Sequence, residues 1–84
     1  MQTQETRRKQ FVEVIATHNI DGSVQPQRIT LKDSSSFEVD EVRNVKKVAM
    51  LSQFATTNRY TVVIKGKEAF LYEDYGKWFV EMKT

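Results

Sequence analysis

The histidine at position 18 is the first residue to consider for chemistry, because imidazole is the side chain that titrates near neutral pH. It stands in the segment "HNIDGSVQPQRITL" (residues 18–31), with one of the three glycines and the only proline. A metal site would need further ligands, but the chain has no cysteine. The neighbouring carboxylates of Asp40-Glu41 and of Glu73-Asp74 would point to opposite faces of a regular strand. We therefore expect a structural or solvent-facing histidine and no metal site.

Serines and paired carboxylates are the next candidates for catalysis. The serines at 34–36 lie in a polar connector, "KDSSS", without a glycine-rich elbow or a nearby histidine to activate them. Glu38 and Asp40 share one face of a predicted strand, about 7 Å apart, but surface carboxylates are common at that spacing. No phosphate-binding loop, dinucleotide fingerprint or calcium loop occurs. We expect no catalytic residue, no cofactor and no enzyme activity.

The basic residues offer a possible nucleic-acid surface. The formal net charge is +2, and residues 10–84 hold ten Lys and Arg against ten Asp and Glu, so the excess lies in the first nine residues. A phosphate-binding surface needs clustered positive potential. The sequence therefore predicts single-stranded nucleic-acid binding only as an alternative function. Its candidate contacts are Arg7, Arg8, Lys9, Arg43, Lys46 and Lys47.

Aromatic residues are concentrated near the C-terminus, where six of the nine fall in the final 25 positions. Strand alternation puts Phe70, Tyr72 and Phe79 on the face opposite to Leu71 and Trp78. One face must form the core. The other face is left to cover by the chain itself, to a partner protein, or to the bases of a single-stranded nucleic acid.

Protein contact is the function that we predict first from this pattern, because aromatic residues dominate interface hot spots. The predicted contact residues are Phe70, Tyr72 and Phe79, and the partner is a second copy or an unidentified protein. Replacing Phe79 by Ser should then leave the fold intact and abolish the association.

These residues must be positioned by strands. "QFVEVIATHN" (10–19) alternates as a strand does, and Asp21-Gly22 predicts a turn into a second strand around Ile29 and Leu31. Near the C-terminus a meander of three strands is predicted over 59–65, 67–73 and 77–83, with turns at the two intervening glycines.

The middle of the chain is ambiguous, because valines recur every third residue at 39, 42, 45 and 48. Branched Cβ atoms disfavour a helix, so we expect a long strand with a bulge near 42–45. A helix within 43–54, which would make the fold α+β, is the alternative. Residues 49–58 could form a helical turn or a long loop.

The predicted fold is all-β: a single small antiparallel barrel, or a strongly curled meander of five or six strands. Residues 1–9 are expected to form a flexible basic arm, and residues 10–84 a single β domain. No apolar run exceeds four residues, so we expect no membrane span and a cytoplasmic location. The predicted core consists of Val12, Val14, Ile29, Leu31, Phe37, Val39, Val62, Ile64, Leu71, Trp78 and Val80.

Hydrophobic and turn residues along most of the chain after residue 10 resemble those of a family of short uncharacterised proteins from Gram-positive bacteria. That family has a Trp-Asp-Gly-Arg connector and a glycine pair where this chain has "LKDSSS" and "FATTN". The resemblance implies a compact bacterial β domain and no particular activity. The residues that carry it are His18-x-x-Asp21-Gly22-Ser23, Pro26, Phe37-Glu38-Val39-Asp40-x-Val42, Arg59-Tyr60-Thr61-Val62, Phe70-Leu71-Tyr72 and Trp78-Phe79-Val80-Glu81.

Overall fold

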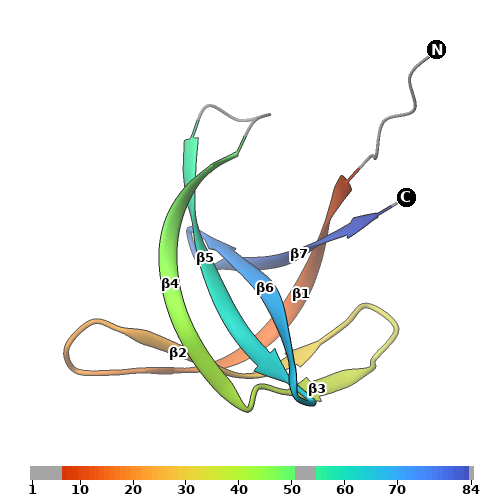
Figure 1. Ribbon diagram of the computed structural model, residues 1–84, viewed down its shortest axis with the longest axis horizontal. Coiled ribbons are helices and arrows are strands. Elements are labelled where there is room, and N and C mark those ends of the chain that lie inside the picture. The colour runs from red at the N-terminus through yellow and green to blue at the C-terminus, as the bar shows by residue number, and fades with distance from the viewer. Residues whose placement is uncertain (1–6, 51–54, 84) are drawn as a thin grey trace.

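The computed structural model describes the backbone at residues 7–50 and 55–83 and the side chains at 9–48 and 57–81. Within these residues every regular element is a β-strand, so no helix there could cross a membrane. The strands form one antiparallel sheet in the order β3-β2-β1-β7-β6-β5-β4 (Figure 1). Their bounds are β1 Arg7–His18, β2 Val24–Thr30, β3 Ser36–Glu38, β4 Glu41–Met50, β5 Ala55–Ile64, β6 Lys67–Asp74 and β7 Lys77–Lys83.

The sheet curls into a half-barrel, and its two edges meet at one end. There the short connection between β3 and β4 bonds to both sides of the molecule. The Val39 amide donates to the Gln27 carbonyl of β2 at 2.9 Å, and the Asp40 amide donates to the Val63 carbonyl of β5 at 2.8 Å. The predicted all-β class, with a strongly curled antiparallel sheet, is confirmed.

The valine-rich segment explains why the structure has seven strands and not five or six. Its residues form β4, with an irregularity in the register between Val42 and Asn44, so the predicted bulge is confirmed. The chain nevertheless breaks at Val39 and Asp40, because their amides bond to different strands, and this break separates β3 from β4. The alternative of a helix is wrong for residues 43–50, and residues 51–54 lie outside the described residues.

Two predicted irregular segments turn out to contain strand. β1 begins at Arg7, so residues 7–9 are not part of a free arm but are paired with β7. Residues 1–6 lie outside the described residues. Positions 49 and 50 belong to β4 and positions 55–58 to β5, where the sequence predicted a helical turn or a loop. Pairing with a neighbouring strand extends these elements beyond the stretches that alternate clearly in the sequence.

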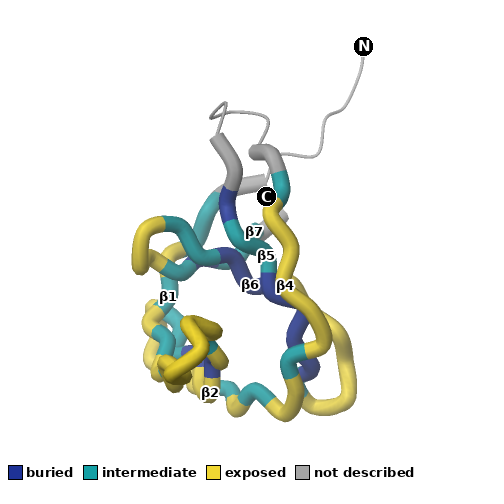
Figure 2. The backbone as a smooth tube through the Cα atoms, turned by 90° about the vertical axis from the view of Figure 1, so that its left-hand side faces the viewer, coloured by how far each residue is buried: buried dark blue, intermediate teal, exposed yellow. Residues whose placement is uncertain are grey.

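The main core cluster, formed by Ile29, Tyr60, Val62 and Leu71, lies on the concave, inner face of the sheet. Figure 2 marks the buried positions along the backbone. The predicted core residues belong to this cluster or pack against it, with the exception of Phe37. Phe37 is half-buried, and its ring lies below the Lys65 ammonium group at 5.4 Å. Tyr60 was missed, although strand alternation places it on the same face as Val62 and Ile64, which were predicted. The partly buried residues around the cluster are Val12, Val14, Leu31, Val39, Val42, Ile64, Trp78 and Val80.

Candidate functional site

The aromatic residues predicted to contact a partner do not form an exposed face. Phe79 is 1% exposed and Tyr72 6%, and their rings stack at 5.2 Å. The ring of Phe11 meets that of Phe79 edge-on at 5.8 Å. The prediction assumed a flat hairpin, but β6 and β7 pair only over residues 72–74 and 77–79, and the aromatic rings pack together on the outer face where these strands meet. Phe70 alone of the three stays accessible, at 49%.

The six predicted nucleic-acid contacts lie on two separate strands. Residues 7–9 belong to β1 and residues 43, 46 and 47 to β4, with three strands between them in the sheet. Arg43 is paired with Glu68 at 3.0 Å and with Glu41 at 3.8 Å. The Lys9 ammonium group lies 4.7 Å from the centre of the Phe79 ring. The side chains of Arg7 and Arg8 lie outside the described residues. The structure therefore does not bring the described members of this set into one patch.

A smaller basic pair does form on the outer face of β4 and β5. The register sets Lys46 directly opposite Arg59, whose guanidinium group lies 4.4 Å from the centre of the Phe70 ring. Like charges in this position repel each other, and the Arg59 Nε atom is buried without a hydrogen-bond partner among the residues that the structure describes. The sequence analysis missed Arg59 because only strand pairing places it beside Lys46.

The carboxylates and serines considered for catalysis are held in local contacts. Glu38 pairs with Arg28, and Asp40 accepts a hydrogen bond from the Lys65 amide at 3.1 Å. The Ser35 amide donates to Asp33 at 3.0 Å. Among the residues whose placement is described, no three His, Asp or Glu side chains lie together as a metal site would require. Each of these contacts stabilises a turn or a strand pair.

The feature that stands out is an open strand edge on β1. β1 pairs with β7 over residues 7–12 and with β2 over residues 13–18. From position 13 onward, no strand of the described residues lies on the side of β1 that faced β7. This open edge of β1, residues 13–18, is about 20 Å long at the usual rise of a strand.

A tight turn explains why β7 covers only part of β1. Tyr75 and Gly76 have positive φ values of 51° and 83°, which reverse the chain directly after β6. The Gly76 amide donates to the Glu73 carboxylate at 2.7 Å and so fixes the turn. β7 therefore begins at Lys77, opposite the middle of β1, and residues beyond Val12 are left unpaired on that side.

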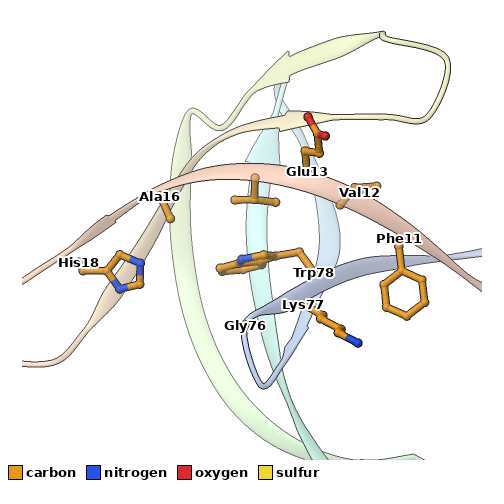
Figure 3. A pocket seen from close by; sticks show the side chains of 9 residues that line it. Phe11, Val12, Glu13, Ala16, His18, Gly76, Lys77 and Trp78 are labelled. Carbon is orange, nitrogen blue, oxygen red and sulfur yellow. The ribbon is translucent and has the colours of Figure 1, made fainter.

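A cleft of about 780 Å³ lies between this open edge and the turn (Figure 3). Trp78 lies below β1 in that view, beside Gly76 and Lys77. The inner-face residues of β1 along the cleft are half-buried, whereas on the outer face Phe11 is 57% exposed and Ile15 62%. Within the open edge, the inner face therefore carries Val14 and Ala16, and the outer face carries Ile15 between Glu13 and Thr17. The cleft is lined by Phe11, Val12, Glu13, Val14, Ala16, His18, Gly76, Lys77 and Trp78.

A second cavity, of about 400 Å³, continues from the cleft into the mouth of the half-barrel. The two share His18, Gly76 and Trp78. The rings of Tyr60 and Trp78 lie 5.1 Å apart, tilted by 48°. Burial, and then the negative charge of Glu73, raises the pKa of Tyr60 above its ordinary value. This mouth cavity is lined by His18, Gly22, Ser23, Val24, Val45, Asn58, Tyr60, Glu73, Gly76 and Trp78.

Sequence reasoning considered His18, Glu73 and Trp78 separately, as a lone histidine, one member of a carboxylate pair and a core residue. Glu73 and Trp78 flank one predicted turn, but His18 comes from a distant part of the chain, and nothing in the sequence indicates that it lies near them. Comparison with protein-family models, with curated proteins and with solved structures gives no match to this chain. The resemblance to the Gram-positive family stays a prediction.

Proposed function

We propose that the protein is a non-catalytic protein-interaction module that binds an extended segment of a partner protein along the open edge of β1. The observation that carries the proposal is the unpaired edge at residues 13–18, next to the apolar cleft over Trp78. Interaction through aromatic residues near the C-terminus is what the sequence predicts. The proposed contact lies on β1 and Trp78 and not on the predicted aromatic residues, because Tyr72 and Phe79 are buried.

An extended segment suits this edge because of its backbone. Along an unpaired antiparallel edge, alternate residues direct both their N–H and C=O groups outward. A strand added there satisfies these groups, while its alternate side chains enter pockets beside it. On the inner side the pocket is formed by Val14, Ala16 and Trp78, so we expect apolar residues at every second position of the bound segment.

The two outermost strands of the sheet are protected against such pairing. β3 is only three residues long, and β4 carries a bulge and the exposed residues Lys46 and Lys47. Short strands, bulges and lysines are the features that prevent edge-to-edge pairing. The open edge of β1 has the sequence "EVIATH", without lysine or proline. Three other stretches of the described strands are also unpaired on one side, and each contains a lysine, which opposes strand addition: residues 7–12 of β1, 67–71 of β6 and 80–83 of β7.

A single segment fits better than a second copy of the chain. β7 occupies the space beside β1 up to Val12. If two copies paired antiparallel around Ile15, the β7 strand of each would run into the other at His18 and beyond. A linear segment of about six residues has no such obstacle.

The test is selection from a display library of random peptides, followed by titration of the chosen peptides. We expect peptides with alternating apolar residues, micromolar affinity as befits a small interface, and amide shifts confined to residues 12–18 and 76–78. The variant Ile15→Lys should lose binding, since a lysine on the edge opposes strand addition. Val45→Lys is the matched control, because Val45 is 50% exposed on β4.

Three outcomes would count against the proposal. One is that no peptide is enriched, and another is that Ile15→Lys binds the peptides as tightly as the unaltered protein. The third is sedimentation that shows a dimer abolished by Ile15→Lys, which would make a second copy the occupant of this edge. The bacterial origin and cytoplasmic location that the sequence predicts stay predictions.

Single-stranded nucleic-acid binding is the second candidate, and the observation in its favour is the group of Lys46, Arg59 and Phe70 on the outer face. An aromatic ring beside two cations suits a base and its phosphate. Affinity for a short single-stranded oligonucleotide should then fall steeply with salt. The affinity should also fall in Lys46→Glu. It should not fall in Lys32→Glu, because Lys32 lies in the connection between β2 and β3. Equal, salt-independent retention of all three proteins would refute this candidate.

A further inference from the structure

One row of side chains crosses the inner face of five adjacent strands, from β4 through β5, β6 and β7 to β1. The pairing registers place these residues directly beside one another, in the order Lys47, Asn58, Glu73, Trp78 and Val12. Glu73 stands in the middle of the row and lines the mouth cavity. A carboxylate is thereby set next to the indole ring inside a concave surface.

The Glu73 carboxylate is held in place by neutral donors. Asn58 Nδ2 donates to its Oε1 atom at 2.8 Å, and the Gly76 amide donates to its Oε2 atom at 2.7 Å. Each oxygen has two lone pairs, so each can still accept another hydrogen bond. Within the described part of the chain no cation is paired with Glu73. Lys47, on the same row, is exposed. The carboxylate thus presents an uncompensated negative charge in a fixed position.

Two aromatic rings stand beside this charge. Trp78 is the cross-strand neighbour of Glu73, and the centre of the Tyr60 ring lies 5.1 Å from that of the Trp78 ring. Both rings line the cavity of about 400 Å³. The face of an aromatic ring is electronegative and attracts a cation, most strongly for tryptophan.

We propose that the mouth of the half-barrel binds an organic cation, an alkylammonium or alkylguanidinium group, between the Glu73 carboxylate and the rings of Tyr60 and Trp78. The alkyl part would contact Val24 and Val45 at the rim of the same cavity. This site differs from that of the proposed strand addition, because the cation lies on the inner face and not along the edge of β1, although Trp78 contributes to both. The protein would thus bind a cation, which its formal net charge of +2 would not suggest.

The test is titration with n-butylammonium chloride and with methylguanidinium chloride, followed by the fluorescence of Trp78, which is the only tryptophan. We expect saturable quenching by both cations at millimolar concentration, as is reasonable for so small a ligand. Sodium chloride at equal ionic strength and the neutral analogue n-butanol should cause no saturable change. In NMR spectra, the Asn58 side-chain amide and the Gly76 amide should shift along with the fluorescence.

Glu73→Gln removes the charge and keeps the shape of the side chain, so it should weaken cation binding by about tenfold or more. Glu41→Gln, an equal loss of charge outside the mouth cavity, should bind normally. Ile15→Lys should also bind normally, which separates this site from the proposed function. Circular dichroism verifies that each variant is folded. If Glu73→Gln is unfolded, Trp78→Leu, followed by NMR shifts, takes its place. Equal binding of n-butanol, unchanged affinity in these mouth variants, or no saturable signal would overturn the proposal.

Discussion

Phe79→Ala is expected to destabilise the protein by about 3 to 5 kcal/mol, the usual cost of truncating a buried phenylalanine. The side chain is 1% exposed, its ring stacks on that of Tyr72 at 5.2 Å, and the ring of Phe11 meets its edge at 5.8 Å. Truncation leaves a cavity among these rings and removes both aromatic contacts. The sequence predicted the opposite, namely that position 79 tolerates replacement because it faces a partner.

The size of this effect is large for so short a chain. At about 0.05 to 0.15 kcal/mol per residue, a protein of 84 residues has a free energy of unfolding of about 4 to 13 kcal/mol. Phe79→Ala would remove much of it, so Phe79→Leu, with an expected loss of about 1 to 2 kcal/mol, is the variant to measure if the first does not fold. Phe70→Ala is the matched control, since Phe70 is 49% exposed and should cost only about 1 kcal/mol.

Urea denaturation followed by Trp78 fluorescence and by circular dichroism measures these differences. The two signals should coincide if unfolding is two-state. Equal losses in Phe79→Ala and Phe70→Ala would refute the reasoning, because they would mean that the outer aromatic cluster does not stabilise the fold. An unchanged midpoint in Phe79→Leu would do the same.

Three further predictions concern the turns and the surface. Gly66 has a φ of +79° with nothing near its Cβ position, so Gly66→Ala should lose about 1 kcal/mol in thermal unfolding through backbone strain alone; an unchanged midpoint would contradict this. Hydrogen bonds from Ser23 lower the pKa of Asp21 from its ordinary value of 3.8. The ionised Asp21 carboxylate therefore stabilises the fold above pH 3.8, and this stabilisation is lost as the pH falls through the lowered pKa. The stability difference from Asp21→Asn should accordingly shrink only in acid. Arg43→Ala should cost at most about 1 kcal/mol, because its pair with Glu68 is half exposed; a larger loss that persists in high salt would show a stronger contact.

Local patterns predicted most of the strands and turns correctly. The alternation in residues 10–18 and 77–80, and the turns at Gly22, Gly66 and Gly76, depend only on neighbours in the chain. The same alternation identified the inner-face residues, because a strand presents every second side chain to one side. The branched side chains of the valine-rich segment favoured a strand over a helix, and β4 confirms this prediction.

The candidate site could not be predicted in this way. His18, Tyr60, Glu73 and Trp78 meet only because four strands pair in one register and the sheet curls. A shift of one residue in any of these registers would turn the corresponding side chain to the outer face. The alternation alone does not reveal which register is adopted.

By itself, the sequence determined that this chain forms antiparallel strands around an inner apolar face, because strand periodicity is a property of the backbone and of adjacent residues. Tertiary structure alone decided that Tyr72 and Phe79 are buried on the outer face and that the pairing of β1 with β7 ends at Val12. It alone decided, too, that Glu73 lies beside Trp78. These features arise from the curl of the sheet and from contacts between residues far apart in the chain, whose free energies depend on how all the strands pack together.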